Sequence, residues 1–540
     1  MFRSPRLPVC FTIVFTAALP ALAQTSPPAA QVDKIFAGWT RDTPGCVVGV
    51  GAKGKPVLTR AYGMADLEHG VRNSADTIFE AGSVSKQFTA AAVALLARDG
   101  KLSLDDPVRK YIPELPDYGT PITIRHMLQH TSGLRDWGSV AEIGGWPRTT
   151  RVYTPAHVLD IVARQGALNF TPGTRWSYSN TGYNLAAIIV ERVSGMTFGE
   201  FSRQRIFAPL GMDHTSWRDD YTRILKNRAI AYEKREDGFH SLMPFENAVG
   251  NGGLLTTVGD LLKWNENFVN PVVGDARLVA EAQQPGKFAD GRPHNYGLGL
   301  FIGSYKGVPM VSHGGATAGY RSALNRYPAQ HVSVALLCNA ANANAGKDAD
   351  AVAELFLDKS LVPPAAPKAR HALGEADLAA MEGLYRETAT GLPLSLVRDN
   401  GALRTGNGRV LHATGARRLE SGGGVMTFEG GGVLRTTDPL GTERIYQREP
   451  AAAPAEAQLR ELAGSYASAD AETSVTVALE AGALVIRQRP DTVLKLEPVY
   501  RDAFRQEGGL VIFRRDAHGK VTGLSMVQDR VWDMRFERRM

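Results

Sequence analysis

The carboxyl-terminal third of the chain repeats one pattern at a constant offset. Gly464 and Tyr466 lie 81 residues after Gly383 and Tyr385. The same offset relates three further positions to their counterparts: Leu378, Met381 and Leu403 to Leu459, Leu462 and Leu484. Such a fixed offset indicates two copies of one supersecondary unit. Each copy begins with a helical turn and continues in short alternating segments separated by Gly, Asp and Asn, which predicts a small antiparallel barrel or meander.

Two segments rich in proline and alanine, residues 361–367 and 450–455, precede the two copies. A chain of 540 residues is also too long for a single domain. We therefore expect a large amino-terminal domain at 24–362 and two small β-barrel domains at 372–449 and 456–540.

The first residues have the pattern of a secretory signal peptide. Arg3 and Arg6 precede an apolar stretch at 9–19, and Ala21-Leu22-Ala23 supplies small residues for cleavage. The apolar stretch is too short to span a membrane, and its cysteine lies inside it, so we expect neither a membrane nor a lipid anchor. Residues 1–23 are thus predicted to direct the protein to the periplasm or outside the cell.

The net charge is +6, and the basic residues are scattered along the sequence without a basic tract. This distribution gives no electrostatic footprint for a nucleic acid, so we expect no nucleic-acid partner.

In the amino-terminal domain, predicted strands lie on both sides of a helical block. Two strands near 47–52 and 57–62 come first, and the helical block covers about 182–207. The remaining strands return between 297 and 338. This order predicts an α/β (α+β) domain with an antiparallel sheet and a helical lobe.

Three short motifs follow one another in this domain: Ser83-Val84-Ser85-Lys86, Tyr178-Ser179-Asn180 and His313-Gly314-Gly315. The first opens an apolar run that reads as a buried helix, so the Ser83 hydroxyl should lie near free backbone N–H groups. Lys86 shares its helix face, whereas Ser85 points to the other side. A serine needs a base, and a lysine can serve when burial lowers its pKa. The motifs predict acyl transfer through Ser83.

With these motifs the chain resembles the penicillin-recognising serine hydrolases, which include β-lactamases, penicillin-binding proteins and their esterase and D-aminopeptidase relatives. A β-lactamase/transpeptidase-like domain followed by two small β-barrels is the layout of the D-aminopeptidase family. The resemblance implies catalytic roles for Ser83, Lys86 and Tyr178, with Tyr178 completing the proton relay. It also implies substrate contacts at four positions: Asn180, His313, Gly315 and Ala316.

By the same resemblance, Asn180 would donate to a substrate carbonyl, and the N–H groups of Ser83 and Ala316 would form an oxyanion hole. Gly314 and Gly315 would let the backbone approach the substrate. His313 stands where β-lactamases usually carry lysine. An imidazole anchors a carboxylate less strongly than an ammonium, which argues against a dedicated β-lactamase.

These features favour an exported serine hydrolase that acts on a small peptide, amide or ester, and among these a D-aminopeptidase-like enzyme for short D-amino-acid peptides. The alternatives are a carboxylesterase, a D-Ala carboxypeptidase, a weak β-lactamase, or a non-catalytic peptidoglycan-binding protein. We expect no cofactor and no metal, because His126 and His130 lack the glutamate of a zinc-protease motif and favour structural roles. A homodimer remains an open alternative.

Cys46 begins one predicted strand and Cys338 ends another. In the fold that the resemblance implies, these strands are antiparallel neighbours, which makes a disulfide an alternative in an oxidising compartment. Because a cross-strand bridge needs a specific Cα separation, two buried thiols are the favoured interpretation.

Overall fold

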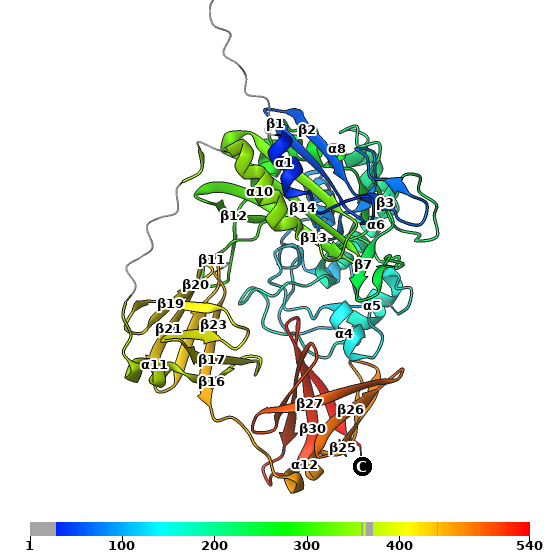
Figure 1. Cartoon of the computed structure of the whole chain (residues 1–540). Helices are drawn as coiled ribbons and strands as arrows, with labels where there is room; N and C mark the ends of the chain where they lie inside the picture. The colour runs from blue at the N-terminus through cyan, green and yellow to red at the C-terminus, as the bar shows by residue number, and fades with distance from the viewer. Residues whose placement is uncertain (1–28, 149, 358–359, 363–370, 440, 540) are drawn as a thin grey trace, which may run out of the picture.

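The computed structural model describes residues 29–148, 150–357, 360–362, 371–439 and 441–539 (Figure 1). The predicted signal peptide lies outside these residues. The chain forms a mixed amino-terminal domain and two closed β-barrels, which confirms the predicted fold class.

A six-stranded antiparallel sheet forms the centre of the amino-terminal domain. Its strand order is β12-β13-β14-β15-β1-β2, so the first strand of the chain pairs with the last strand of the domain, and the second strand forms the edge of the sheet. The strands are β1 (Cys46–Ala52), β2 (Lys55–Tyr62), β12 (Phe301–Tyr305), β13 (Val308–Thr317), β14 (Tyr320–Tyr327) and β15 (Val332–Cys338).

Both faces of this sheet are covered, which explains why β1 and β15 are apolar at almost every position. Val48 and Leu336 point into one core with α1 (Ala29–Ile35) and α10 (Ala345–Leu357). Val47 joins the other core, because successive strand residues point to opposite faces. On that face α8 (Val258–Asn267) packs closely, since a Cβ at Gly49 would lie 3.2 Å from its side chains.

The helical lobe lies against this second face. Its central helices are α2 (Ser85–Arg98) and α6 (Thr181–Ser194), and every residue of α2 from Ser85 to Leu96 is buried. The other helices are α3 (Ile124–Leu128), α4 (Trp137–Ile143), α5 (Pro155–Ala163), α7 (Phe198–Ser202) and α9 (Ala276–Ala282). Short strands complete the domain: β3 (Met64–Asp66), β4 (Val71–Arg72), β5 (Phe79–Glu80), β6 (Ser216–Trp217), β7 (Tyr232–Arg235), β8 (Gly238–Ser241), β9 (Leu254–Thr256), β10 (Gly286–Lys287) and β11 (Pro293–His294).

Each repeat unit is a closed barrel of eight antiparallel strands, preceded by a seven-residue helix. The first has α11 (Glu375–Met381), β16 (Gly383–Glu387), β17 (Pro393–Asp399), β18 (Ala402–Thr405), β19 (Val410–Gly415), β20 (Arg418–Ser421), β21 (Gly424–Gly430), β22 (Val433–Thr437) and β23 (Glu443–Glu449). The second has α12 (Glu456–Leu462), β24 (Gly464–Ser468), β25 (Thr473–Glu480), β26 (Ala483–Gln488), β27 (Thr492–Tyr500), β28 (Ala503–Gln506), β29 (Gly509–Arg515), β30 (Val521–Gln528) and β31 (Val531–Arg538).

One contact of the repeat recurs in both barrels. The Tyr385 hydroxyl donates to the Met381 carbonyl at 2.7 Å, and the Tyr466 hydroxyl donates to the Leu462 carbonyl, also at 2.7 Å. Each bond ties the helix to the first strand of its barrel. The constant sequence offset therefore reflects two copies of one folded unit.

The second barrel docks against the helical lobe of the amino-terminal domain (Figure 1). Arg135 donates to the Asp470 carboxylate at 2.7 Å and to the Asp533 carbonyl at 2.6 Å. The backbone N–H of Gly166 also donates to Asp470. The apolar core of this barrel is continuous with that of the lobe, so the two pack as one unit at this interface.

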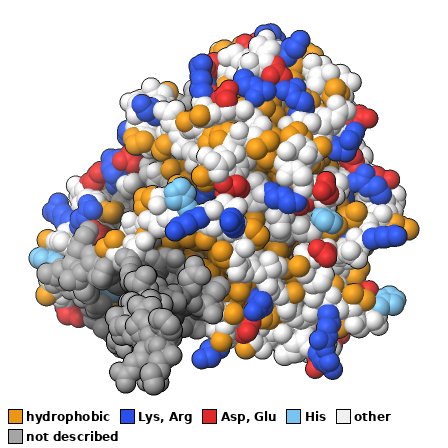
Figure 2. All heavy atoms as spheres, turned by 90° about the horizontal axis from the view of Figure 1, so that it is seen from above, with side chains coloured by type: hydrophobic (Ala, Val, Ile, Leu, Met, Phe, Trp, Pro, Cys, Tyr) orange, Lys and Arg blue, Asp and Glu red, His pale blue; other side chains and the backbone are white. Residues whose placement is uncertain are grey.

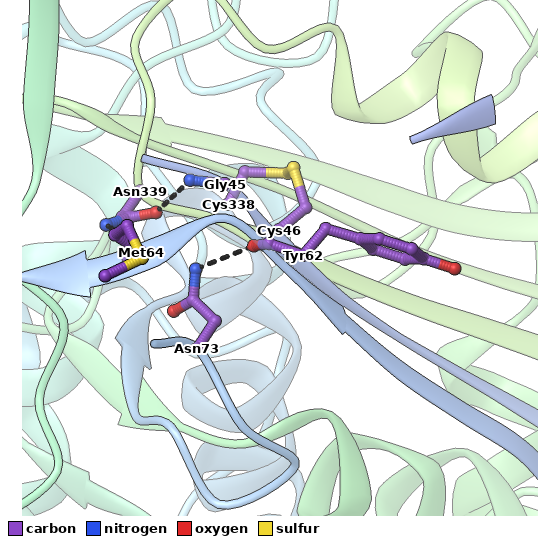
Figure 3. Close-up of a disulfide and its surroundings, with 7 residues drawn as sticks. All are labelled: Gly45, Cys46, Tyr62, Met64, Asn73, Cys338 and Asn339. Atoms are coloured by element: carbon purple, nitrogen blue, oxygen red, sulfur yellow. Dashed lines mark hydrogen bonds between the residues drawn. A yellow bond between two sulfur atoms is a disulfide. The ribbon is translucent and has the colours of Figure 1, made fainter. Parts of the chain in front are cut away.

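The preference for two buried thiols is wrong, because Cys46 and Cys338 form a disulfide with an S–S distance of 2.12 Å (Figure 3). β1 and β15 pair in a register that sets these two residues directly opposite each other, with Cα atoms 4.0 Å apart. Strand patterns in the sequence predicted both strands but could not fix this register.

Loss of the disulfide should destabilise the amino-terminal domain. The bridge closes a loop of 292 residues, so it restricts the unfolded chain strongly, and its removal is expected to cost about 2–4 kcal/mol. Cys46→Ala combined with Cys338→Ala should lower the urea midpoint of tryptophan fluorescence. Reduced wild type should unfold like the double variant. Equal midpoints for the oxidised and reduced protein would contradict the expectation.

On the described part of the face seen in Figure 2, basic and acidic side chains are interspersed without a single basic stripe. Among the described residues, no helix is both long and apolar enough to cross a membrane.

Candidate active site

The three sequence motifs meet at one cleft of about 650 Å³. Six of the predicted site residues line it: Ser83, Tyr178, Asn180, His313, Gly315 and Ala316. The seventh, Lys86, is fully buried beneath them. The site residues thus lie at α2, the start of α6 and strand β13, and the fold brings them together from positions more than 200 residues apart in the sequence.

Ser83 lies in a 3₁₀ turn (Gly82–Val84) that leads directly into α2, two residues before the α-helix begins. This differs slightly from the predicted helix start, yet it keeps Ser83 and Lys86 adjacent. The Lys86 Nζ lies 3.1 Å from the Ser83 Oγ. A nucleophile and a base are therefore within hydrogen-bonding distance.

The Lys86 amine has two further acceptors, the Asn180 Oδ1 at 2.9 Å and the Asn251 carbonyl at 2.7 Å. Burial lowers the pKa of Lys86 well below its ordinary value, and the positive charge of Arg530 lowers it further. The nearby Asp136 carboxylate acts in the opposite direction. The surroundings thus favour a neutral amine, which can accept a proton from serine.

Tyr178 lines the cleft beside Ser83 and Lys86. The Lys86 Nζ is 4.9 Å from the centroid of its ring. Burial raises the pKa of Tyr178, while a hydrogen bond with Ser83 opposes this rise. Its phenol is therefore protonated at neutral pH and can donate a proton to a leaving group.

Ser85, the rival serine, has a structural role. Its hydroxyl is fully buried and accepts a hydrogen bond from the Leu254 N–H at 3.1 Å. It therefore faces β9 and not the cleft, as the helix geometry predicted.

The serine turn and strand β13 approach so closely that both need glycine. A Cβ at Gly315 would lie 2.1 Å from the Ala81 carbonyl oxygen and 2.3 Å from the Ser322 Oγ. A Cβ at Gly82 would lie 2.8 Å from the Ala316 nitrogen. This approach sets the backbone of residue 316 beside the turn that carries Ser83, where paired N–H groups can stabilise an oxyanion.

Gly315→Ala should therefore impair catalysis, because the added methyl group must push β13 away from the serine turn. We expect kcat/KM to fall about 100-fold or more, as for loss of an oxyanion-hole donor. Gly303→Ala is the matched control, since Gly303 lies on β12 outside the described cleft wall and a Cβ there would meet no described atom within 4 Å. Circular dichroism checks the fold of both variants. Equal activity in the two would contradict the assigned geometry.

His313 lines the cleft, and its side chain is uncharged. Its Nδ1 lies 2.6 Å from the Gly314 carbonyl, so this nitrogen carries the hydrogen, and its Nε2 accepts from the Tyr296 hydroxyl at 3.0 Å. Burial, with a smaller effect of Lys86, lowers the pKa of His313 to about 3. The imidazole is neutral, and both ring nitrogens are engaged within the protein.

The two other histidines of this region have structural partners, as predicted. The His126 Nδ1 accepts from the Thr123 N–H in a capping box, and the His130 Nδ1 accepts from the Ser179 N–H. Within the described ranges, Asp66, Glu68 and His69 form a potential metal-binding group. The Asp66 carboxylate there accepts the backbone N–H groups of Glu68 and His69 and pairs with the His69 ring, which accounts for the cluster as a turn.

Sequence patterns missed three arginines that line the cleft, Arg148, Arg321 and Arg530, together with Asn251. Arg530 comes from the second barrel, at the tip of the β30–β31 hairpin. In the sequence, Asp529-Arg530 has the pattern of an ordinary solvated turn between two strands. No sequence pattern therefore indicated that Arg530 lies in the cleft.

Known proteins with a similar sequence span nearly the whole chain. The Beta-lactamase family model matches residues 30–358, and the model of a domain of unknown function, DUF3471, matches residues 448–539. A D-aminopeptidase of Brucella ovis is 27% identical over 509 residues, which cover 89% of this chain and 93% of that protein. A D-aminopeptidase of Brucella anthropi is 31% identical over 282 residues, about half of each chain.

Solved structures agree with this comparison. D-amino acid amidase from Ochrobactrum anthropi SV3 has a TM-score of 0.53 and 25% identity, covering 62% of this chain and 99% of the amidase. An octameric penicillin-binding protein homologue from Pyrococcus abyssi has the same fold, with a TM-score of 0.56 and 21% identity over 86% of this chain and 99% of the homologue. Because the Beta-lactamase model covers more than half of the sequence, this serine hydrolase belongs to the β-lactamase family.

Proposed function

We propose that the enzyme is a D-aminopeptidase-like peptidase or amidase that cleaves short D-amino-acid peptides and amides through an acyl-enzyme on Ser83. The observation that carries this proposal is the buried Lys86 amine, held 3.1 Å from the Ser83 Oγ by two further acceptors. A lysine in this environment is a base and not a surface charge. A binding protein without catalysis would have no use for it.

In the proposed reaction, neutral Lys86 takes the proton of the Ser83 hydroxyl as its oxygen bonds to the substrate carbonyl carbon. The resulting oxyanion faces the N–H groups of Ser83 and Ala316. When the C–N bond breaks, Tyr178 gives its proton to the leaving amine and regains one from Lys86. Water then attacks the carbonyl carbon of the ester and gives a proton to the same groups, which return a proton to the Ser83 oxygen as its bond to that carbon breaks.

The substrate class rests on the relatives, which are named for D-aminopeptidase and D-amino acid amidase activities. The cavity of about 650 Å³ suits a short peptide rather than a polymer. We also propose that the enzyme works in the periplasm or outside the cell. The signal-peptide pattern of residues 1–23 supports this location, as does the disulfide, which persists in oxidising compartments.

A panel of chromogenic substrates tests the proposal. D-Ala-nitroanilide should be hydrolysed faster than L-Ala-nitroanilide, nitrophenyl butyrate and nitrocefin, as measured by kcat/KM. Equal rates on the D- and L-anilides would contradict a D-amino-acid enzyme. A preference for nitrophenyl butyrate would instead favour a carboxylesterase, and a preference for nitrocefin a β-lactamase.

A further inference from the structure

A group of buried charges adjoins the turn that carries Ser83. Two glutamates and three arginines form it: Glu80, Glu246, Arg148, Arg218 and Arg228. Glu80 is three residues before Ser83 in the sequence and, like Arg218, has a side chain that is 1% exposed. Among the described residues of the cleft wall, Arg148 is the one member of this group. Glu80 and Arg218 therefore do not bind a substrate in the cleft, and their place beside the serine turn needs another explanation.

Glu80 and Arg218 form a bidentate ion pair. The Arg218 Nε donates to the Glu80 Oε2 at 2.7 Å, and its Nη2 donates to the Oε1 at 3.1 Å. Glu80 lies on β5, Arg218 directly follows β6, and β9 lies between these two strands in a three-stranded sheet. The ion pair thus joins the two outer strands of this sheet across the central one.

On the glutamate side, β5 continues directly into the turn that carries Ser83. The N–H of Ala81, the residue after Glu80, donates to the Leu254 carbonyl of β9 at 2.8 Å. The Ala81 carbonyl accepts the Ser322 hydroxyl of β14 at 2.7 Å. The position of β5 therefore determines where the serine turn begins.

On the arginine side, the same ion pair is connected to the support of the base. The backbone N–H of Arg218 donates to the Gly253 carbonyl at 2.7 Å. Two residues before Gly253, the Asn251 carbonyl accepts from the Lys86 amine, also at 2.7 Å. One ion pair therefore links the strand that leads to the nucleophile with the segment that holds the lysine.

Glu246 extends these contacts to the cleft wall. Its Oε1 lies 3.7 Å from the Arg218 Nη2, and its carboxylate accepts two donors of Arg148. The charges alternate in the order Glu80, Arg218, Glu246 and Arg148. Each of the two inner groups therefore has an opposite charge on both sides, which favours a single arrangement of the four side chains.

Stability alone does not account for a buried ion pair at this place. The desolvation of two charges offsets much of their attraction, and apolar side chains of similar volume often give a protein that is equally stable. A bidentate guanidinium–carboxylate contact does fix the relative orientation of the two groups, because both are planar. Such a contact is suited to holding two segments in one geometry.

We propose that Glu80 and Arg218 are positioning residues, which hold the serine turn against the Asn251 segment so that the Ser83 oxygen stays beside the Lys86 amine. This inference rests on the proposed acyl-enzyme mechanism, and it adds two residues that touch neither the substrate nor the reacting atoms. A displacement of about 1 Å between reacting groups can cost about 100-fold in rate, even when the change that causes it lies away from the chemistry.

The combined variant Glu80→Leu with Arg218→Met separates positioning from stability. It replaces the ion pair with apolar side chains, so it should fold and keep a urea midpoint close to that of the wild type. We expect kcat on D-Ala-nitroanilide to fall about 10- to 100-fold, with KM within about twofold. The second-order rate of Ser83 labelling by a fluorophosphonate should fall by a similar factor. A pair that only stabilises the fold would leave these rates unchanged in the folded variant.

Arg218→Lys supplies a second variant. It keeps the charge but gives up the bidentate contact, so it should lose part of the labelling rate, and it carries the test if the combined variant does not fold. The matched control is Arg386→Met with Glu449→Leu, which removes a 2.8 Å ion pair of the first barrel that lies outside the described cleft wall. This control should keep both the wild-type kcat and the wild-type labelling rate.

The pH profile excludes a purely electrostatic effect. The charges that act on the pKa of Lys86 are those of Arg530, Asp136 and Arg148, so the acid limb of acylation should keep its position in the combined variant. An acid limb that moves together with the loss of rate would overturn the inference, because the pair would then act through charge and not through geometry.

Wild-type kcat and labelling in the folded combined variant would also overturn the inference. So would wild-type labelling of Arg218→Lys if the combined variant does not fold. In these cases the wild type is still labelled at Ser83, and the proposed function stands. If the wild type is not labelled at Ser83 and hydrolyses none of the chromogenic substrates, the proposed function fails, and the inference fails with it.

Discussion

Ser83→Ala is expected to reduce turnover by about 10,000-fold or more, because the Ser83 hydroxyl is the one to which the Lys86 amine is hydrogen-bonded among the residues that the structure describes. Labelling by a fluorophosphonate or penicillin probe should disappear as well. The fold should be unaffected, since the substitution removes only a hydroxyl whose described partners are Lys86 and Tyr178 and leaves the backbone bonds of the turn in place. Steady-state kinetics and gel fluorescence of the probe measure both effects.

Ser85→Ala is the matched control for this variant. It removes the acceptor of the Leu254 N–H and should cost about 1–3 kcal/mol of stability. It should nevertheless keep turnover and labelling. Undiminished labelling of the Ser83→Ala protein would mean that another residue is the nucleophile.

Lys86→Met should lower the rate of acylation by about 100- to 10,000-fold, because it replaces the base with an apolar chain of similar length. The buried site accepts methionine without leaving an unpaired charge. Lys101→Met, on the exposed turn after α2, is the control and should acylate normally. Stopped-flow acylation with a chromogenic substrate separates this step from later ones. Normal acylation of Lys86→Met would show that the relay begins elsewhere.

The pH profile tests the same residue. The neutral amine is the active form, so acylation should fall as the pH drops through the lowered pKa of Lys86 and should be level above it. Arg530→Gln removes a positive charge that lowers this pKa, while Asp136 and Arg148 still act on it. The acid limb should therefore move to higher pH in that variant. A wild-type rate that rises continuously to pH 10 would contradict a lowered lysine pKa.

Much of this architecture could be predicted because local patterns determine it. The apolar run after Ser83 predicted the buried helix α2. The spacing of Ser83, Ser85 and Lys86 distinguished the predicted nucleophile, Ser83, and the predicted base, Lys86, from the structural hydroxyl of Ser85. The constant offset in the last third identified two copies of one unit, because a repeated unit must repeat its internal contacts, such as those of Tyr385 and Tyr466. The roles that the resemblance implies for these side chains still await the experiments above.

Features that depend on long-range register were not predictable in the same way. Whether Cys46 faces Cys338 depends on a strand pairing between residues 292 positions apart. The position of Arg530 depends on how a barrel docks through Arg135 and Asn169, and a sequence pattern records neither contact. Asn251 contributes only its backbone carbonyl to Lys86, so no side-chain motif marks it. Tertiary packing supplied each of these parts of the site.

The central claim is an acyl-enzyme on Ser83 formed with Lys86 as the base, and mass spectrometry of the trapped intermediate tests it most directly. The wild-type enzyme is mixed with a slowly released penicillin or D-amino-acid ester, quenched in acid, and analysed intact and after proteolysis. We predict one adduct with the mass of the acyl group, located on Ser83, and none in Lys86→Met within the same interval. An adduct on Ser85 or another residue, or turnover of the ester without any adduct at Ser83, would contradict the claim.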